Sequence, residues 1–206
     1  MNKSKAAIVV LAAGRGMRFH GDGHKLEQRL TPHATNASTT VLARTIGHAL
    51  ETGLRVVVVT SLALAPLVRQ VVAEHDVVVL PEQNSQGRPS AVGMGYSIAA
   101  GVSATGDADG WLILPADMPL LLPASMLVVA SAIEQYPVAY AQYRGHRGHP
   151  VGFSVELYSE LIDLQGDEGA RRVVARYPSQ AIEVNDPGVL VDVDTVEDLA
   201  RLQTQL

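Results

Sequence analysis

Short apolar runs alternate with amphipathic stretches over the first part of the chain. The apolar runs consist mainly of aliphatic residues and have the length of buried strands. We predict strands at Ala6–Leu11, Val56–Val59, Val77–Leu80 and Trp111–Leu114. We predict helices between and after them, at Thr40–Glu51, Ala63–Glu74, Ser90–Val102 and Pro123–Gln135. Strands that alternate with helices form a parallel sheet covered on both faces, so the pattern predicts a three-layer α/β/α fold.

From Val138 onward the pattern changes. The segment "VAYAQYRGHRGHPVGFS", Val138–Ser154, predicts two strands joined by a glycine-rich turn, which add a small antiparallel pair. The remaining elements predicted are helices near Val155–Leu164 and Glu168–Arg176, a strand at Val189–Val193, and a last helix, Thr195–Leu202, with Thr195 as its N-cap. No repeat or low-complexity linker interrupts the chain, so we expect residues 1–206 to form a single domain.

Composition and charge exclude several classes of protein. Hydrophobic residues make up 47% of the chain and aromatic residues only 4%, so the core must be aliphatic. The formal net charge of −5, without a basic stripe, argues against a nucleic-acid groove. The lack of cysteine excludes disulfides, thiolate zinc sites and a cysteine nucleophile. Since no apolar run reaches the roughly 18 residues of a membrane span and the first run reads as a strand, we expect a cytoplasmic protein without membrane contact.

The loop after the first predicted strand concentrates small, flexible and cationic residues. It reads "LAAGRGMRFHGDGHKL" and carries Arg15, Arg18 and Lys25 among four glycines. In a parallel sheet this loop leaves the carboxyl edge, where ligands bind. Glycines let backbone N–H groups turn inward, and the cations neutralise phosphates, so the loop is a candidate anion site. Its spacing fits neither G-x-x-x-x-G-K-[ST] nor G-x-G-x-x-G, and the alternative is a mobile surface loop with incidental charges.

Two further stretches carry candidate chemistry. In "WLILPADMPLL", Asp117 follows a buried strand and can hold Mg²⁺, which prefers oxygen ligands; the alternative is a helix-capping aspartate before Pro119. In "GMGYSIAAGV", two glycines stand at a helix start. They indicate either N–H groups that face a ligand or close packing on the sheet.

These motifs together resemble a known family. "LAAGRGMRF…HKL" is similar to the L-A-A-G-x-x-x-R-M-G-x-x-K-L signature of nucleotidyltransferases that activate phosphorylated substrates with an NTP, above all the molybdenum cofactor cytidylyltransferases and their guanylyltransferase relatives. The resemblance implies a Rossmann-like fold of the nucleotide-diphospho-sugar transferase type. It also implies that the backbone of this loop meets the base, while Arg15 and Lys25 neutralise the triphosphate. The nucleotide-binding residues it implies are Leu11, Ala12, Ala13, Gly14, Arg15, Arg18, Lys25, Gly93, Met94 and Ser97.

The same resemblance assigns roles to later motifs. "LPADMP" looks like the family's L-x-D-x-P metal motif, which makes Asp117 a ligand of Mg²⁺. "DVDTVEDL" is similar to its D-I-D-T-P-E-D-L ending and makes Asp192, ahead of Asp194, the second metal ligand, although one of the two can instead cap the last helix. "RGHPVGF" and "LQGDEGAR" resemble two further family segments. They imply that the acceptor is bound by His149, Asp167 and Gly169, with a zinc site as the weaker alternative for His149.

The chain departs from the family in the length of its loops. Arg18 and Lys25 lie seven positions apart where the family usually has five, so Phe19–Lys25 carries about two extra residues, and Glu27–Thr39 is also longer. Asn84 matches a family asparagine with a longer spacing to the next motif. These differences bear on which NTP and which acceptor fit.

The implied reaction moves a nucleoside monophosphate from an NTP, CTP above all, to a phosphate monoester, molybdopterin above all, with release of pyrophosphate. A phosphate oxygen needs no general base, so catalysis would consist of alignment and of charge neutralisation by Arg15, Lys25 and Mg²⁺ on Asp117. The implied partners include a molybdoenzyme or a cofactor-delivery protein. The alternatives are another small-molecule phosphate as acceptor and a non-catalytic module that binds nucleotide or pterin.

Overall fold

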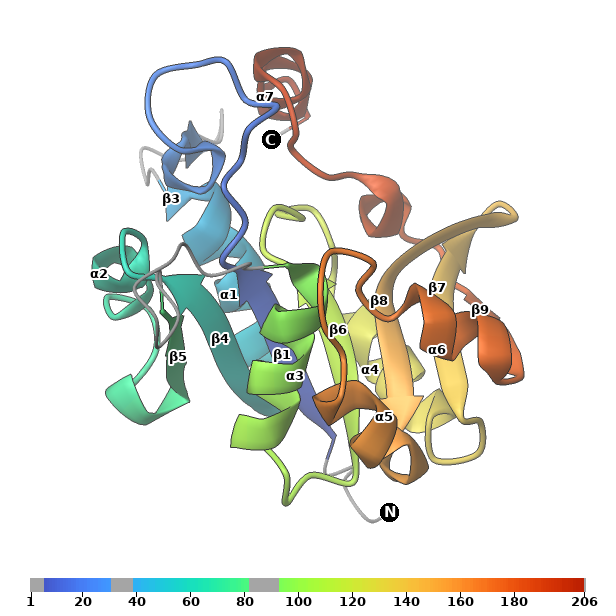
Figure 1. The fold of residues 1–206 in the computed structure, drawn as a ribbon. Helices are drawn as coiled ribbons and strands as arrows, with labels where there is room; N and C mark the ends of the chain where they lie inside the picture. The colour runs from blue at the N-terminus through green and yellow to red at the C-terminus, as the bar shows by residue number, and fades with distance from the viewer. Residues whose placement is uncertain (1–5, 31–38, 82–92, 206) are drawn as a thin grey trace.

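The computed structural model describes residues 6–30, 39–81 and 93–205. Within them the backbone forms a seven-stranded sheet between two layers of helices, and a separate pair of short antiparallel strands (Figure 1). The large sheet consists of β1 (Ala7–Ala12), β4 (Arg55–Ser61), β5 (Val77–Leu80), β6 (Gly110–Pro115), β7 (Val138–Tyr143), β8 (His146–Ser154) and β9 (Ser179–Glu183). The small pair consists of β2 (Arg29–Leu30) and β3 (Thr39–Thr40).

The large sheet is mostly parallel, as predicted. Its strand order is β5-β4-β1-β6-β8-β7-β9. β1 pairs in parallel with β4 and β6, and β7 in parallel with β9, whereas β8 runs antiparallel to both of its neighbours. β7 and β8 form the predicted hairpin, whose turn places Arg144 and Gly145 in the left-handed region, with φ of 49° and 79°. The expected α/β/α fold with a small antiparallel addition is confirmed.

Helices cover both faces of the large sheet (Figure 1). One face packs against α1 (Val41–Glu51), α2 (Ala65–Val68) and α4 (Pro123–Ala132), and the other against α3 (Met94–Ala104), α5 (Tyr158–Ile162) and α6 (Arg171–Arg176). The last helix, α7 (Val196–Gln203), lies beyond the carboxyl edge of the sheet, beside the loop that follows β1. Short 3₁₀ turns occur at Lys25–Glu27, Glu74–Asp76, Val155–Leu157 and Pro187–Leu190.

β1 is the centre of the core and fixes where the loop after it emerges. Ile8 and Val10 pack toward α1 and α4, whereas Ala7 and Val9 pack toward α3, and all four are fully buried. Because β1 and β6 run in parallel register, their carboxyl ends meet at one edge. The N–H of Ala116 accordingly donates to the carbonyl of Leu11 at 3.1 Å. The segments after the two strands therefore start side by side.

Several predicted elements differ in the structure. The helix predicted at Ala63–Glu74 is wrong in extent: only Ala65–Val68 is α-helical, because Pro66 allows no earlier start and the β-branched Val71 and Val72 propagate a helix poorly. The helices predicted at Val155–Leu164 and Glu168–Arg176 are also shorter, at Tyr158–Ile162 and Arg171–Arg176.

The strand predicted at Val189–Val193 is wrong. Pro187–Leu190 is a 3₁₀ turn, and the residues up to the last helix have no regular structure. Val189 and Val193 are nevertheless fully buried, so the apolar run signalled burial and not strand geometry. The edge strand β9 was not predicted, because "SQAIE" lacks a clear apolar alternation.

No helix among residues 6–30, 39–81 and 93–205 combines the length and apolar character needed to cross a bilayer.

Candidate active site

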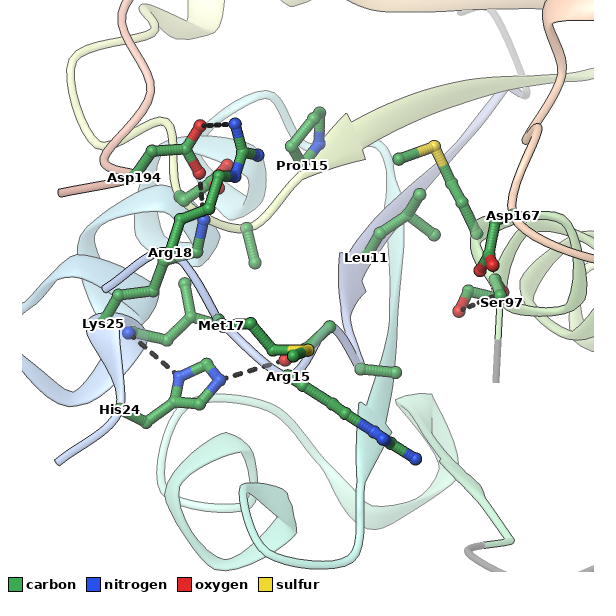
Figure 2. Close-up of a pocket in the computed structure, with 18 residues that line it drawn as sticks. Leu11, Arg15, Met17, Arg18, His24, Lys25, Ser97, Pro115, Asp167 and Asp194 are labelled. Atoms are coloured by element: carbon green, nitrogen blue, oxygen red, sulfur yellow. Dashed lines mark hydrogen bonds and ion pairs between the residues drawn. The ribbon is translucent and has the colours of Figure 1, made fainter. Parts of the chain in front are cut away.

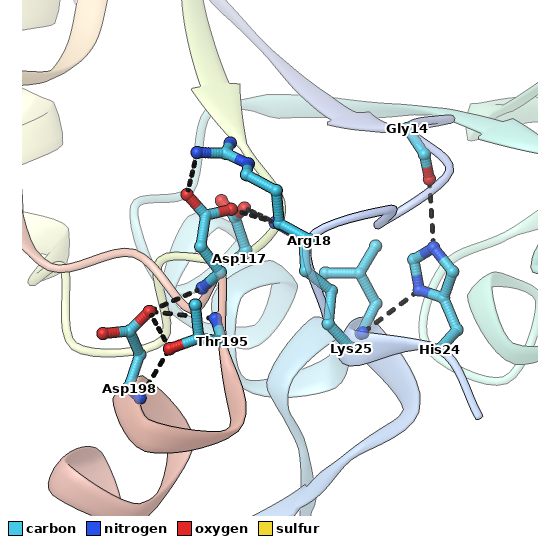
Figure 3. Close-up of polar contacts among 9 residues, drawn as sticks. Gly14, Arg18, His24, Lys25, Asp117, Thr195 and Asp198 are labelled. Atoms are coloured by element: carbon cyan, nitrogen blue, oxygen red, sulfur yellow. Dashed lines mark hydrogen bonds and ion pairs between the residues drawn. The ribbon is translucent and has the colours of Figure 1, made fainter. Parts of the chain in front are cut away.

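The loop after β1 is closed by His24. Its Nε2 donates to the carbonyl of Gly14 at 3.0 Å, and its Nδ1 accepts from the N–H of Leu26 at 3.2 Å (Figures 2 and 3). A carbonyl only accepts and a backbone N–H only donates, so these bonds fix the neutral ring with its proton on Nε2. Phe19 anchors the middle of the loop in the core. The contact between His24 and Gly14 thus holds the two ends of the loop together, directly before Lys25.

Lys25 and Asp117 meet at the carboxyl edge of the sheet. The Nζ of Lys25 lies 2.5 Å from Oδ2 of Asp117 and 2.8 Å from Oδ1 of Asp194. The three side chains are only 13%, 14% and 17% exposed, whereas Arg18, which pairs with Asp194 at 2.8 Å, is mostly exposed. Burial lowers the pKa of Lys25, but the two ion pairs raise it more, so its pKa lies above the usual value and the ammonium is charged at neutral pH.

Asp117, Asp192 and Asp194 form a carboxylate cluster. Each offers one oxygen, and these oxygens lie within 4.8 Å of one another. Burial and the negative charges of Asp117 and Asp194 raise the pKa of Asp192. Oδ1 of Asp117 is buried and has no hydrogen-bond partner among the described residues. An unpartnered buried oxygen among three carboxylates fits a divalent cation with hard oxygen ligands, such as Mg²⁺.

Two distant parts of the chain place these carboxylates. Asp117 follows β6, and its carbonyl accepts from the N–H of Val193 at 3.0 Å. Asp194 precedes Thr195, the N-cap of α7, as predicted. Oδ2 of Asp198 accepts from the N–H groups of Asp194 and Thr195 at 3.2 and 2.9 Å, which completes a capping box (Figure 3). The cap of the last helix therefore fixes the backbone that carries Asp194.

A cleft of about 420 Å³ opens above the cluster (Figure 2). The predicted nucleotide-binding residues that line it are Leu11, Ala13, Gly14, Arg15, Arg18, Lys25, Gly93, Met94 and Ser97, together with Asp117 and Asp167. Ala12 does not line it, because its side chain is buried in the sheet. Arg15 extends away from the carboxylate cluster, toward the opposite end of the cleft. The structure thus brings the signature loop, the start of α3 and the end of β6 to one cleft.

The glycines at the start of α3 serve close packing. The N–H of Gly95 donates to the carbonyl of Gly166 at 2.9 Å, so this donor does not face a ligand. A Cβ on Gly93 would lie only 2.1 Å from the same oxygen. Gly95 thus packs closely, but on the segment of Gln165 and Gly166 and not on the sheet, as the packing alternative had it. The segment of Gly166 and Asp167 therefore packs on the start of α3, ahead of α6, which begins at Arg171.

A second cavity, of about 740 Å³, adjoins the cleft and shares Leu11, Met94 and Pro115 with it. His149 lines this cavity, and its Nδ1 is buried without a partner among the described residues. Burial lowers the pKa of His149, and the positive charge of Arg147 lowers it further. The negative charge of Asp117 raises it, but by less than burial lowers it. The guanidinium of Arg147 lies over the ring of Tyr140, 4.4 Å from its centre.

The three predicted acceptor residues do not line one common cavity. Asp167 lines the first cleft and His149 the second cavity. Gly169 lines a third cavity together with Asp167 and packs against Met94, where a Cβ would lie 2.7 Å from the sulfur. Asn84 lies outside the described residues.

Comparison with known proteins identifies the family. The model of the MobA-like NTP transferase domain matches residues 8–181. The chain belongs to this MobA-like family of nucleotidyltransferases. Among curated proteins, the Bacillus subtilis purine catabolism protein PucB is 36% identical over 112 residues, which are 52% of this chain and 54% of PucB. The match therefore spans about half the length of that relative.

Solved structures agree with the assignment. Rv0371c from Mycobacterium tuberculosis H37Rv superposes on this MobA-like chain with a TM-score of 0.78 and 27% identity, over 98% of this chain and 100% of that one. A complex of the same protein with manganese gives a TM-score of 0.73 and 26% identity over the same shares.

Sequence reasoning missed two features of the MobA-like site. His24 was treated only as part of a lengthened loop, although it closes that loop on Gly14. Asp194 was ranked below Asp192, yet Asp194 pairs with both Lys25 and Arg18, whereas Asp192 is exposed. The signal available for Asp194 was its place next to the N-cap Thr195, because a capped helix start fixes its neighbour.

Proposed function

We propose that this MobA-like protein transfers a nucleoside monophosphate from CTP to a phosphate monoester acceptor of the molybdopterin type. One observation carries the proposal: Lys25 from the signature loop and Asp117 from the end of β6 meet at 2.5 Å beneath a cleft lined by that loop. A triphosphate in this cleft would contact cations on one side and a metal-binding carboxylate on the other. The family membership supports the class of reaction.

In the proposed reaction, the protein binds the NTP and the acceptor and aligns their reacting phosphates. An oxygen of the acceptor phosphate attacks the α-phosphorus of the NTP, the bond to the β-phosphate oxygen breaks, and pyrophosphate leaves. Arg15, Arg18 and Lys25 bind and neutralise the triphosphate, and the backbone at Gly14 and Gly16, which line the cleft without a side chain, lets it approach closely. A divalent cation held by Asp117 and Asp192, with Asp194 beside them, would neutralise charge on the phosphate oxygens. Manganese in the complex of Rv0371c supports a metal of this class.

The acceptor belongs in the second cavity, beside His149. This cavity adjoins the nucleotide cleft and is large enough for a ring system. His149, with its lowered pKa, acts there as a neutral hydrogen-bonding group, and Asp167 lines the adjoining first cleft. We assign the acceptor contact to these two side chains, and to Gly169 close packing against Met94, which lines both cavities.

The test is pyrophosphate release across matched NTP and acceptor pairs with Mg²⁺. Lys25→Ala and Asp117→Ala should each lower the transfer rate by about 100-fold or more, since each removes a charge that stabilises the transition state. Arg55→Ala and Asp107→Ala break an exposed ion pair whose residues do not line the cleft. They are matched controls and should transfer at the parental rate.

Three results would contradict the proposal. Parental transfer by Asp117→Ala would exclude the metal role. Preference for another NTP or a small polyol phosphate would exclude the CTP and molybdopterin assignment. Tight nucleotide binding without pyrophosphate release from any pair would identify a non-catalytic binding module.

A further inference from the structure

The ammonium of Lys25 sits where the carboxylate cluster would hold a metal. Its Nζ contacts Oδ2 of Asp117 at 2.5 Å and Oδ1 of Asp194 at 2.8 Å, and the three side chains are largely buried (Figure 3). Two of the three carboxylates that can bind a divalent cation are therefore already paired with one positive charge of the protein itself.

A divalent cation and this ammonium compete for the same oxygen atoms. Both bind carboxylate oxygens at short range, and two cations held by shared oxygens in a partly buried site repel each other strongly. Lys25 and Arg18 leave free only Oδ1 of Asp117, which has no partner among the described residues, and the exposed carboxylate of Asp192. A divalent cation needs several oxygen ligands, so binding by all three carboxylates requires Lys25 to leave.

The side chain of Lys25 can also reach the nucleotide cleft. It lines the nucleotide cleft as well as contacting the cluster, and it stands on a 3₁₀ turn whose backbone is held by the cap at His24. Its flexible four-carbon stem can swing between two partners while that backbone stays fixed. A triphosphate in the cleft is negatively charged, so the ammonium can pair with its oxygens in place of the carboxylates.

We propose that Lys25 is the built-in counter-ion of the carboxylate cluster in the free protein, and that it moves to the triphosphate when a divalent cation takes its place. The inference rests on the proposed function, because it assigns a regulation to the same site. Metal alone then binds weakly, and metal and nucleotide bind cooperatively, since each removes the obstacle to the other. The protein holds its metal only together with its substrate.

The first test is a titration with Mn²⁺ alone, followed by electron paramagnetic resonance of the free ion. Lys25→Met keeps the length of the side chain and removes its charge. The variant should bind Mn²⁺ about tenfold tighter or more, because the metal no longer has to displace the charged hydrogen bonds between Lys25 and the carboxylates. Arg55→Met, on the exposed pair with Asp107, is the matched control and should bind like the parent. Equal affinity of Lys25→Met and the parent would overturn the inference.

The second test uses the unaltered protein. Its only lysines are Lys3, Lys5 and Lys25, so an amine-acetylating reagent followed by peptide mass spectrometry reports on Lys25 against two internal references. Lys25 should react slowly in the free protein, faster with saturating Mn²⁺ alone, and slowly again with Mn²⁺ and a non-hydrolysable CTP analogue. A Lys25 labelling rate that Mn²⁺ leaves unchanged while Mn²⁺ binds would overturn the inference.

These measurements separate this inference from the proposed function. Faster labelling with Mn²⁺ in a protein that transfers nothing would support the exchange and reject the transferase. Transfer activity in a protein whose Lys25→Met variant binds Mn²⁺ no better than the parent would support the transferase and reject the exchange.

Discussion

At the scale of single residues, His24 decides the shape of the signature loop. His24→Asn should keep the cap, because an asparagine oxygen accepts from the N–H two residues on, but it cannot reach the carbonyl of Gly14. We expect the KM for the NTP to rise several-fold, with an unfolding free energy within about 1.5 kcal/mol of the parent, the net value of one hydrogen bond. Steady-state kinetics and urea denaturation measure both.

The matched control is His20→Asn, which changes an exposed histidine of the same loop and should leave both quantities unchanged. A fall in stability without a change in KM would show that the contact between His24 and Gly14 is structural only.

The sequence predicted the charged residues of the site better than the polar contacts between them. Lys25 and Asp117 were expected in one site because cations after the first strand and a carboxylate after the fourth both leave the carboxyl edge of a parallel sheet. The contact of His24 with a carbonyl ten residues earlier depends on the path of an irregular loop, which no periodicity encodes. The choice between Asp192 and Asp194 likewise depended on a segment without regular structure.

At the scale of elements, the start of α3 is held by close contact with the segment before α6. Gly93→Ala should lower the unfolding free energy by about 1–3 kcal/mol, because its Cβ would lie 2.1 Å from the carbonyl oxygen of Gly166. It should also weaken nucleotide binding, since Gly93 lines the cleft. Thermal unfolding and nucleotide titration measure the two effects.

The control for Gly93 is Gly47→Ala in α1, where a Cβ meets nothing within 4 Å. This change should leave nucleotide binding unchanged and raise stability by up to about 1 kcal/mol, because alanine favours a helix over glycine. Equal stability of the two variants would contradict the packing of α3 described above.

Elements were predictable where the apolar pattern was long or alternated with helices. Val77–Leu80 was predicted with its observed bounds, and the helix after Thr40 within one residue. The pattern failed for Val189–Val193, because buried valines pack equally well from a 3₁₀ turn, and for β9, whose partly exposed residues lack an apolar repeat.

At the scale of the whole molecule, His149 links stability to pH. Burial lowers its pKa in the folded state, so below about pH 6.5 the unfolded chain takes up a proton that the folded one does not. This contribution to stability is present above that pH and is lost as the pH falls through the lowered folded pKa, with a slope of at most about 1.4 kcal/mol per pH unit. Urea denaturation at a series of pH values should show a flatter profile for His149→Gln than for the parent.

The control for His149 is His146→Gln, at an exposed histidine in the turn of the same hairpin, which should keep the parental profile. A parental slope in His149→Gln would show that this buried ring does not govern acid sensitivity below about pH 6.5.

The layered architecture as a whole was predictable because aliphatic strands that alternate with helices have few other ways to bury both faces. The single-domain organisation stays a prediction. The second cavity was not predictable, because it depends on how β1, α3, β6, β8 and α6 meet, and these elements come from distant parts of the chain.

The pair of Lys25 and Asp194 joins positions 169 residues apart. Loop closure over such a distance costs more entropy than any local contact, and it cannot begin before the later partner exists. During synthesis, a chain that still lacks its last helix already possesses β1, its loop and β6, but Lys25 then has one carboxylate fewer to hold it. We therefore expect Lys25 to be held by Asp117 alone until the segment around Asp194 folds back onto the loop.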